Sequence, residues 1–192
     1  MEPGVAGARE TLTIQAGEGI ELQPMSLHHA ERLYALIDRN RARLRQWLPW
    51  VQTTFCVDDL VAFINDRERD NADRISLTTV IFADGEMCGS IGLHAIDQRD
   101  RYTSIGYWID SAFEGRGIAT RACRAIIDAG FRDYGLHRIV IQCATGNERS
   151  GAIARRLGFV EEGVLREAEW LYDHWVDLRV FSMLEHHWKH AL

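Results

Sequence analysis

The sequence predicts a single α/β domain built on a mixed, mostly antiparallel sheet of about seven strands. Its 192 residues fit one domain and are enough to bury a sizeable core. Apolar residues alternate with period two in several short runs and recur at helical spacing in others. The expected order is strand, helix, helix, three strands, helix, strand, helix and two strands, which places antiparallel neighbours before one strand–helix–strand unit.

The first half of the chain is expected to supply one strand region and two helices. Residues 1–10 read as a loose tail. Residues 11–25 alternate around two glycines, which predicts strand with a turn inside it. Residues 26–48 carry leucine and isoleucine at helical spacing after Ser26, a suitable N-cap. Residues 57–71 form a second amphipathic pattern, so a second helix is expected there.

The second half begins with strands and ends with a long hairpin. Asp84-Gly85 lies between two apolar runs, a strong hairpin signal, and Gly135 is a natural helix stop. The last hairpin is expected to turn near Tyr172 and Asp173. The predicted elements are a hairpin over 74–96, a strand over 101–110, a helix over 117–135, a strand over 136–145, a short helix over 147–159 and the hairpin over 160–188.

Composition excludes several kinds of chemistry. The net charge of −6 argues against a nucleic-acid-binding surface. Of the 22 basic residues only Lys189 is a lysine, which excludes a Gly-Lys-Ser/Thr phosphate loop and a Schiff-base lysine. The chain shows no signal peptide and no apolar run long enough for a membrane helix, so a cytoplasmic protein with no membrane partner is expected.

Metal and disulfide sites are not expected either. The cysteines at 56, 88, 123 and 143 are widely spaced, without a C-x-x-C pair, and read as reduced and mostly buried thiols. Cys143 is interpreted as core rather than as a nucleophile. The sequence HHWKH at 186–190 resembles metal ligands in composition only, because no carboxylate or cysteine accompanies it.

The stretch FEGRGIATRA, residues 113–122, carries the first functional signal. Gly115 and Gly117 stand between a predicted strand and a predicted helix, where glycine permits positive φ and close approach to the main chain. A helix N-terminus accepts anions. A dinucleotide site is excluded, because Thr120 occupies the third glycine position and no acidic residue ends the next strand. A tight turn without ligand and a coenzyme A pyrophosphate both remain.

A second block, IVIQCATGNERSGAIARRLGF, raises the specificity. With EGRGIAT it resembles the Gcn5-related N-acetyltransferase (GNAT) superfamily and, within it, the RimL-type ribosomal-protein-serine N-acetyltransferases. The family loop Gln/Arg-x-x-Gly-x-Gly/Ala is matched at Gly117 and Ala119, whereas Glu114 departs from the usual Gln or Arg. The resemblance spans nearly the whole chain. It implies helices on both faces of the sheet, and strands splayed to hold acetyl-CoA.

The resemblance also implies a set of cofactor-binding residues. The loop is expected to hold the pyrophosphate through its main-chain N–H groups, the end of the preceding strand to lie along the pantetheine arm, and an asparagine to hydrogen-bond that arm. No metal is implied. The residues are Gly115, Arg116, Gly117, Ile118, Ala119 and Thr120 for the pyrophosphate, Trp108, Ile109 and Asp110 for the arm, and Asn147.

Two catalytic residues follow from the resemblance. Many members use a tyrosine where this chain has Ala154, and the RimL-type branch assigns Ser150 to support the leaving thiolate. Period-two alternation places Glu167 and Glu169 on one face of a strand and cannot choose between them; the resemblance selects Glu169 as the base. A main-chain N–H near Ile109 is expected to stabilise the oxyanion.

The implied function is transfer of acetyl from acetyl-CoA to a primary amine by direct attack. The expected acceptor is the N-terminal α-amine of a ribosomal protein. A small amine, such as an aminoacyl-nucleotide antibiotic or a polyamine, is the alternative within the same chemistry. A non-catalytic acyl-CoA-binding module is the alternative from another class. Residues 47–50 are expected to wall the acceptor pocket, and a homodimer is common in the resembling branch.

Overall fold

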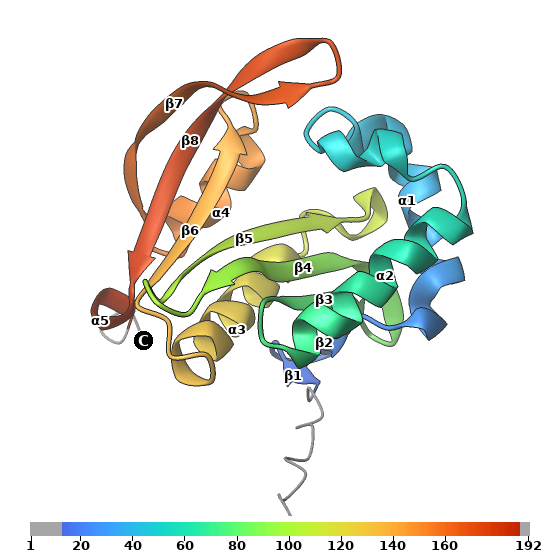
Figure 1. Cartoon of the computed structure of the whole chain (residues 1–192), viewed down its shortest axis with the longest axis horizontal. Coiled ribbons are helices and arrows are strands. Elements are labelled where there is room, and N and C mark those ends of the chain that lie inside the picture. The colour runs from blue at the N-terminus through green and yellow to red at the C-terminus, as the bar shows by residue number, and fades with distance from the viewer. Residues whose placement is uncertain (1–12, 189–192) are drawn as a thin grey trace, which may run out of the picture.

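The computed structural model describes residues 13–188 and shows one twisted sheet with helices on both faces (Figure 1). The strands run in the order β1-β2-β3-β4-β5-β6-β8-β7. They are β1 (Ile14–Gln15), β2 (Ile20–Pro24), β3 (Leu77–Ala83), β4 (Glu86–Asp97), β5 (Tyr102–Ile109), β6 (Arg138–Ala144), β7 (Val160–Leu171) and β8 (His174–Leu184). The helices are α1 (Ala30–Leu44), α2 (Val57–Ala72), α3 (Ile118–Arg132), α4 (Glu148–Arg156) and α5 (Glu185–Trp188). Three short 3-10 turns join them: η1 (Leu27–His29), η2 (Pro49–Thr53) and η3 (Ser111–Phe113).

The expected mixed sheet is confirmed, with two differences of detail. The sheet has eight strands rather than seven, because the first strand region folds back on itself as the two-residue β1 paired with β2. The helix expected over 26–48 is shorter. A 3-10 turn precedes α1, which ends at Leu44, and a turn then leads into η2, which begins at Pro49. Proline lacks the N–H that a continuing helix needs.

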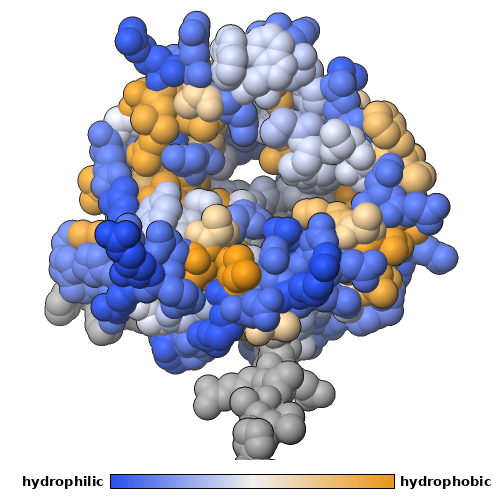
Figure 2. Space-filling model, viewed as in Figure 1, coloured by the Kyte–Doolittle hydropathy of each residue, from blue (hydrophilic) through white to orange (hydrophobic). Residues whose placement is uncertain are grey.

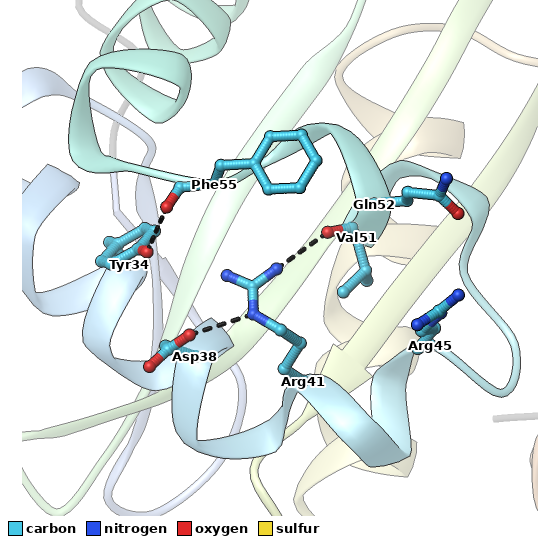
Figure 3. A pocket seen from close by; sticks show the side chains of 7 residues that line it. All are labelled: Tyr34, Asp38, Arg41, Arg45, Val51, Gln52 and Phe55. Carbon is cyan, nitrogen blue, oxygen red and sulfur yellow. Dashed lines mark hydrogen bonds and ion pairs between the residues drawn. The ribbon is translucent and has the colours of Figure 1, made fainter.

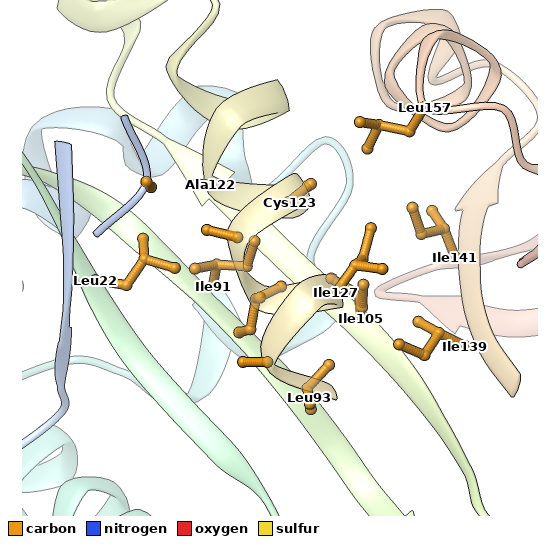
Figure 4. Close-up of a cluster of buried hydrophobic side chains, with 14 of the residues drawn as sticks. Leu22, Ile91, Leu93, Ile105, Ala122, Cys123, Ile127, Ile139, Ile141 and Leu157 are labelled. Carbon is orange, nitrogen blue, oxygen red and sulfur yellow. The ribbon is translucent and has the colours of Figure 1, made fainter. Parts of the chain in front are cut away.

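Two hydrophobic cores lie on opposite faces of the sheet. The larger joins α3 and α4 to one face, where Ile91, Ile105 and Ile141 meet Ile127 and Leu157 (Figure 4). The smaller joins α1 and α2 to the other face through apolar side chains of β3 and β4. Burial of these aliphatic side chains is the main source of fold stability. Helices on both faces are therefore as expected.

One parallel pair interrupts the antiparallel sheet. β5 and β6 pair in parallel over four residue pairs, from Tyr102↔Arg138 to Ile105↔Ile141. Beyond that point β5 continues to Ile109 and β6 to Ala144 without pairing to each other. The unpaired ends of the two strands open the sheet, which is the expected splay.

The final hairpin departs from simple alternation. β8 lies between β6 and β7, so β7 forms the edge of the sheet. The register shifts between the pairs Leu165↔Leu178 and Glu169↔Val176, so three residues of β7 face one residue of β8. Glu167 lies in this bulge with φ 48°, and its N–H donates to Asp177 Oδ1 at 2.8 Å. The expectation that Glu167 and Glu169 belong to one alternating face is wrong, because the bulge removes Glu167 from the pattern.

The remaining expectations concern cysteines, metals and membranes. Cys88, Cys123 and Cys143 are buried free thiols, whereas Cys56 is exposed at the start of α2. Within residues 13–188 no group of three or more His, Cys, Asp or Glu could hold a metal ion. No helix in the same range is long and apolar enough to cross a membrane. The tail at 1–10, and Lys189 and His190 of the HHWKH sequence, lie outside the described residues.

Candidate active site

The glycine loop between η3 and α3 presents a row of free main-chain donors. Gly115 and Gly117 have φ of 74° and 72°, and Gly117 is the N-cap of α3. No hydrogen bond among the described residues occupies the N–H groups of residues 115–120. A Cβ built on either glycine would meet no atom within 4 Å. The loop therefore has the geometry and the open space to bind a pyrophosphate through its N–H groups.

Glu114 links this loop to two helices. Its carboxylate accepts from Arg43 of α1 at 2.7 Å, and its other oxygen accepts from Arg149 of α4. Arg43 also donates to the carbonyl of Ile109 at the end of β5. The residue that departs from the family motif thus holds α1, α4 and the end of β5 around the loop. Ion pairs of this kind fix geometry more than they add stability.

Asp110, a buried residue just after β5, ties the same region to α1. Its carboxylate is 2% exposed; it accepts from Asn40 at 2.9 Å and from Arg39, both on α1. Burial alone would raise the pKa of Asp110, but the hydrogen bonds from Asn40 and Arg39 outweigh it and leave the pKa below its ordinary value. The side chain faces α1, so only the main chain of Asp110 is available to line the cofactor cleft.

Ser150 lies in the first turn of α4 and contacts β5. Its N–H donates to Oδ1 of the N-cap Asn147 at 3.2 Å, which fixes the start of the helix. Its hydroxyl oxygen lies 2.9 Å from the hydroxyl of Tyr107. Ala154 is fully buried one turn further along α4, so no hydroxyl occupies that position. The structure places a tyrosine next to Ser150 from β5 instead.

Glu169 is the one residue of β7 from 160 to 170 that is partly buried rather than exposed. Burial raises the pKa of its carboxyl above the ordinary value. A carboxylate with a raised pKa is a better base near neutral pH than an exposed one. The bulge at Glu167 and the burial of Glu169 together separate two glutamates that the sequence pattern left equivalent.

Ser150 and Glu169 lie on opposite faces of the sheet. Phe181 and Met183 of β8 belong to the core beneath α3 and α4, so alternation along β8 turns Val176 to the other face. Glu169 pairs directly with Val176 and shares that face. Ser150 belongs to α4. The splay between β5 and β6 is therefore the route by which groups on the two faces can meet.

The tip of the β7–β8 hairpin contacts the segment that follows α1, and this contact closes the mouth of the site on one side. Tyr172 at the tip of the β7–β8 hairpin donates to the carbonyl of Leu48, and its ring lies 4.7 Å from the Arg45 guanidinium. The Trp47 ring lies 3.7 Å from a Cβ placed on Gly146. In the space-filling view a deep hollow opens between the hairpin and the segment from α1 to η2 (Figure 2). Trp47 and Leu48 make these two contacts, and the role of residues 47–50 as an acceptor wall stays a prediction.

A cavity of about 210 Å³ lies beside α1 and η2 (Figure 3). Arg41 crosses it, donating to the Val51 carbonyl at 2.9 Å and to Asp38 at 3.0 Å. Arg45 also lines it, and this side chain contacts Tyr172 of the hairpin tip. None of the cofactor or catalytic residues predicted from the sequence lines this cavity, so it is not assigned to the transfer chemistry.

Several residues of the site were missed by sequence reasoning. Tyr107 shares its strand face with Ile105, and that pattern predicts a core residue. The positions of Asn40 and Arg43 predict ordinary helix residues, and the position of Tyr172 predicts a turn residue. Their partners lie 43, 70, 71 and 124 positions away, for Tyr107–Ser150, Asn40–Asp110, Arg43–Glu114 and Tyr172–Leu48. No local pattern could have joined them.

The comparisons with known proteins agree with this geometry. Residues 20–160 match the family model described as the acetyltransferase (GNAT) domain. The chain belongs to the GNAT family. YdaF of Bacillus subtilis (strain 168) is 38% identical over 178 residues, 92% of this chain and 97% of YdaF. The ribosomal-protein-serine acetyltransferase of Escherichia coli (strain K12) is 31% identical over 174 residues, 91% of this chain and 97% of that protein.

Solved GNAT structures share the fold closely. A RimL ribosomal L7/L12 alpha-N-protein acetyltransferase in complex with coenzyme A superposes with a TM-score of 0.88 at 28% identity, covering 90% of this chain and 98% of RimL. MccE, a microcin C7 self-immunity acetyltransferase in complex with acetyl-CoA and AMP, superposes with a TM-score of 0.84 at 32% identity. The match covers 88% of this chain and 94% of MccE. This GNAT enzyme is thus an N-acetyltransferase that uses acetyl-CoA, as expected.

Proposed function

We propose that this GNAT enzyme acetylates the N-terminal α-amine of a protein. The acceptor is a ribosomal protein, as the names of its relatives state for those enzymes. The observation that carries the proposal is the half-buried Glu169, whose raised pKa suits a base and which lies on the face opposite α4. An α-amine has a pKa near 8, so roughly one part in ten is already neutral at pH 7. A single carboxylate base is sufficient for such an acceptor.

Acetyl-CoA supplies the acetyl thioester, and this chain's loop and splayed strands hold it. The N–H groups of residues 115–120 bind the pyrophosphate, and the main chain of residues 108–110 lies along the pantetheine arm. The Asn147 side-chain oxygen is occupied by the Ser150 N–H, whereas its amide nitrogen has no partner within residues 13–188. That amide nitrogen donates to the arm.

The chain's own groups then divide the chemistry. Glu169 removes the proton of the amine, directly or through a water molecule. A main-chain N–H near Ile109 donates to the oxyanion; the Asp110 N–H is not this donor, because it is bonded to the Cys88 carbonyl at 2.7 Å. Ser150 donates a hydrogen bond to the leaving sulfur. The two faces of the sheet thus carry separate parts of one direct transfer.

The test is thiol release from acetyl-CoA with peptides that begin with Ser or Ala, set against the same peptides blocked at the N-terminus but carrying an internal lysine. Turnover that requires the free terminus supports the proposal. Turnover of polyamines alone contradicts it. Tight acetyl-CoA binding, measured by calorimetry, without turnover of any amine favours the binding-module alternative.

A second acceptor class is favoured by one specific observation. The partly buried Trp50 and Trp108 rings lie 6.4 Å apart, and flat aromatic surfaces can stack on planar groups. MccE was solved with AMP as well as acetyl-CoA. An aminoacyl-nucleotide amine is therefore the second candidate. Its turnover, lost on Trp50→Ala while peptide turnover persists, would identify it.

The proposal extends to assembly and location. β7 is the edge of the sheet, and Val160, Val164 and Leu165 are 56%, 45% and 46% exposed on it. An apolar sheet edge is suited to pairing with another chain. A homodimer through β7, in the cytoplasm where ribosomal proteins are made, completes the proposal. Light scattering during size-exclusion chromatography tests the dimer, with Leu165→Glu expected to give the monomer.

A further inference from the structure

Three side chains meet where β5 and β6 part. The last parallel pair is Ile105↔Ile141, and Tyr107 and Cys143 lie two residues further along their strands, so both face α4 like that pair. Ser150 in the first turn of α4 lies against them: its hydroxyl oxygen is 2.9 Å from the Tyr107 hydroxyl. Cys143 is close enough to Ser150 for the serine hydroxyl to lower the pKa of its thiol. The cluster is thus placed at the opening that holds the thioester.

Both neighbours of Ser150 keep their protons at neutral pH. Burial raises the pKa of Tyr107 far above that of a free phenol, against the opposing effect of its hydrogen bond with Ser150. Burial likewise raises the pKa of the Cys143 thiol, against the opposing influence of Ser150. The phenol and the thiol are therefore available as donors throughout the working pH range.

The donors and acceptors around Ser150 restrict the direction of its hydroxyl hydrogen. A serine oxygen accepts two hydrogen bonds and donates one. When the Tyr107 O–H donates to that oxygen, the serine hydrogen must point away from the phenol. The Tyr107 hydroxyl lies 2.9 Å from Ser150 Oγ, whereas the Ser150 carbonyl, its other acceptor, is 3.3 Å away.

We infer that Tyr107 is a positioning residue that, by donating to Ser150 Oγ, aims the serine hydroxyl hydrogen at the leaving sulfur. This inference rests on the proposed role of Ser150 and adds to it a residue outside the family motif. Ser150 alone could turn its hydrogen to the Tyr107 oxygen or to the sulfur. Donation from Tyr107 removes the first choice and organises the donor before the reaction begins.

The charge balance of the step needs no proton from Tyr107. The amine nitrogen forms the new bond to the acetyl carbon, its proton passes to Glu169, and the carbon–sulfur bond breaks with the electron pair on sulfur. An ordinary thiol has a pKa of about 8.5, so the leaving sulfur is stabilised enough by one hydrogen bond and takes its proton from solvent afterwards. Tyr107 and Ser150 both end the step protonated.

The test is a double-mutant cycle with Tyr107→Phe and Ser150→Ala. Loss of one neutral hydrogen bond predicts that Tyr107→Phe lowers kcat about fivefold to tenfold, with KM for acetyl-CoA unchanged. In the Ser150→Ala background the same change is expected to alter kcat less than about twofold. Tyr134→Phe is the control, because Tyr134 is also half-buried but contacts Arg74 far from the cleft.

A second readout needs no acceptor. The pKa of the thiol of bound coenzyme A is followed by thiolate absorbance, and Tyr107→Phe and Ser150→Ala are each expected to raise it by a similar amount. A wild-type kcat and thiol pKa in Tyr107→Phe would overturn the inference, as would losses that simply add in the double variant. If no peptide is turned over but the thiol pKa shifts as expected, the proposed acceptor fails and the role of Tyr107 holds.

Discussion

Replacing Glu169 by Gln tests the base directly. The side chain is half-buried, and the cause of its raised pKa is loss of solvation alone, so the substitution breaks no ion pair. A general base contributes about 10²- to 10⁴-fold. The lower end is expected here, because an α-amine already supplies roughly one neutral molecule in ten at pH 7. A loss of about 10²-fold in kcat corresponds to about 2.7 kcal/mol of barrier.

The effect of Glu169→Gln should depend on pH. A base whose pKa is raised is lost as pH falls through that value, so the wild-type rate should decline at a higher pH than an exposed glutamate, with its pKa of about 4.3, would give. Between pH 7 and 9 the neutral fraction of an α-amine rises about ninefold, from roughly a tenth to nine tenths. The ratio of wild-type to variant rates should shrink by up to that factor.

The assay is kcat against pH from 5 to 9 with one N-terminal peptide, alongside calorimetry of acetyl-CoA binding. Glu167→Gln is the matched control, because Glu167 lies two residues away, is exposed, and is held in the bulge by its main-chain N–H. A wild-type rate and pH profile for Glu169→Gln would refute the reasoning. So would an equal loss in Glu167→Gln.

Three further changes, the first with a matched control, test the supporting structure. Gly117→Ala, at φ 72°, should cost roughly 1 kcal/mol or more of unfolding free energy and weaken acetyl-CoA binding about tenfold by calorimetry; Gly135→Ala, at φ 63° beyond the end of α3, should cost stability alone. Asp110→Asn should lower the unfolding free energy by roughly 2 kcal/mol in denaturant titrations, less than for a wholly buried pair because Arg39 is exposed. Because the folded pKa of Asp110 is depressed, that difference should begin to shrink as pH falls below about 4 and should be lost once pH is below the folded pKa. Arg138 and Ser182 lower the pKa of Glu162 to about 2, so by thermal denaturation Glu162→Gln should reduce stability above about pH 4.3, and the difference should shrink as pH falls from there and be lost below about 2.

The sequence was informative wherever the cause of a structure is local. Gly115 and Gly117 predicted the loop because no other residue adopts positive φ so readily. Asp84-Gly85 predicted the hairpin for a similar reason. Alternation failed at Glu167 because a bulge depends on how two strands pair, and the sequence of one strand alone gives little sign of it. The contact between Tyr107 and Ser150 depends on how α4 lies over β5, and that depends on the whole packed core.

The placement of β8 between β6 and β7 has a consequence for how the enzyme comes into being. Glu169 precedes β8 in the chain, yet it has a fixed position only through its pairing with Val176, and β7 pairs with no other strand. The nucleophile's base therefore cannot be in place until the last strand of the described fold has been synthesised and inserted. Pairings between distant segments form slowly. A nascent chain that ends before β8 would contain the complete glycine loop and Ser150. It could bind acetyl-CoA but could not transfer the acetyl group, because Glu169 would not yet be in position.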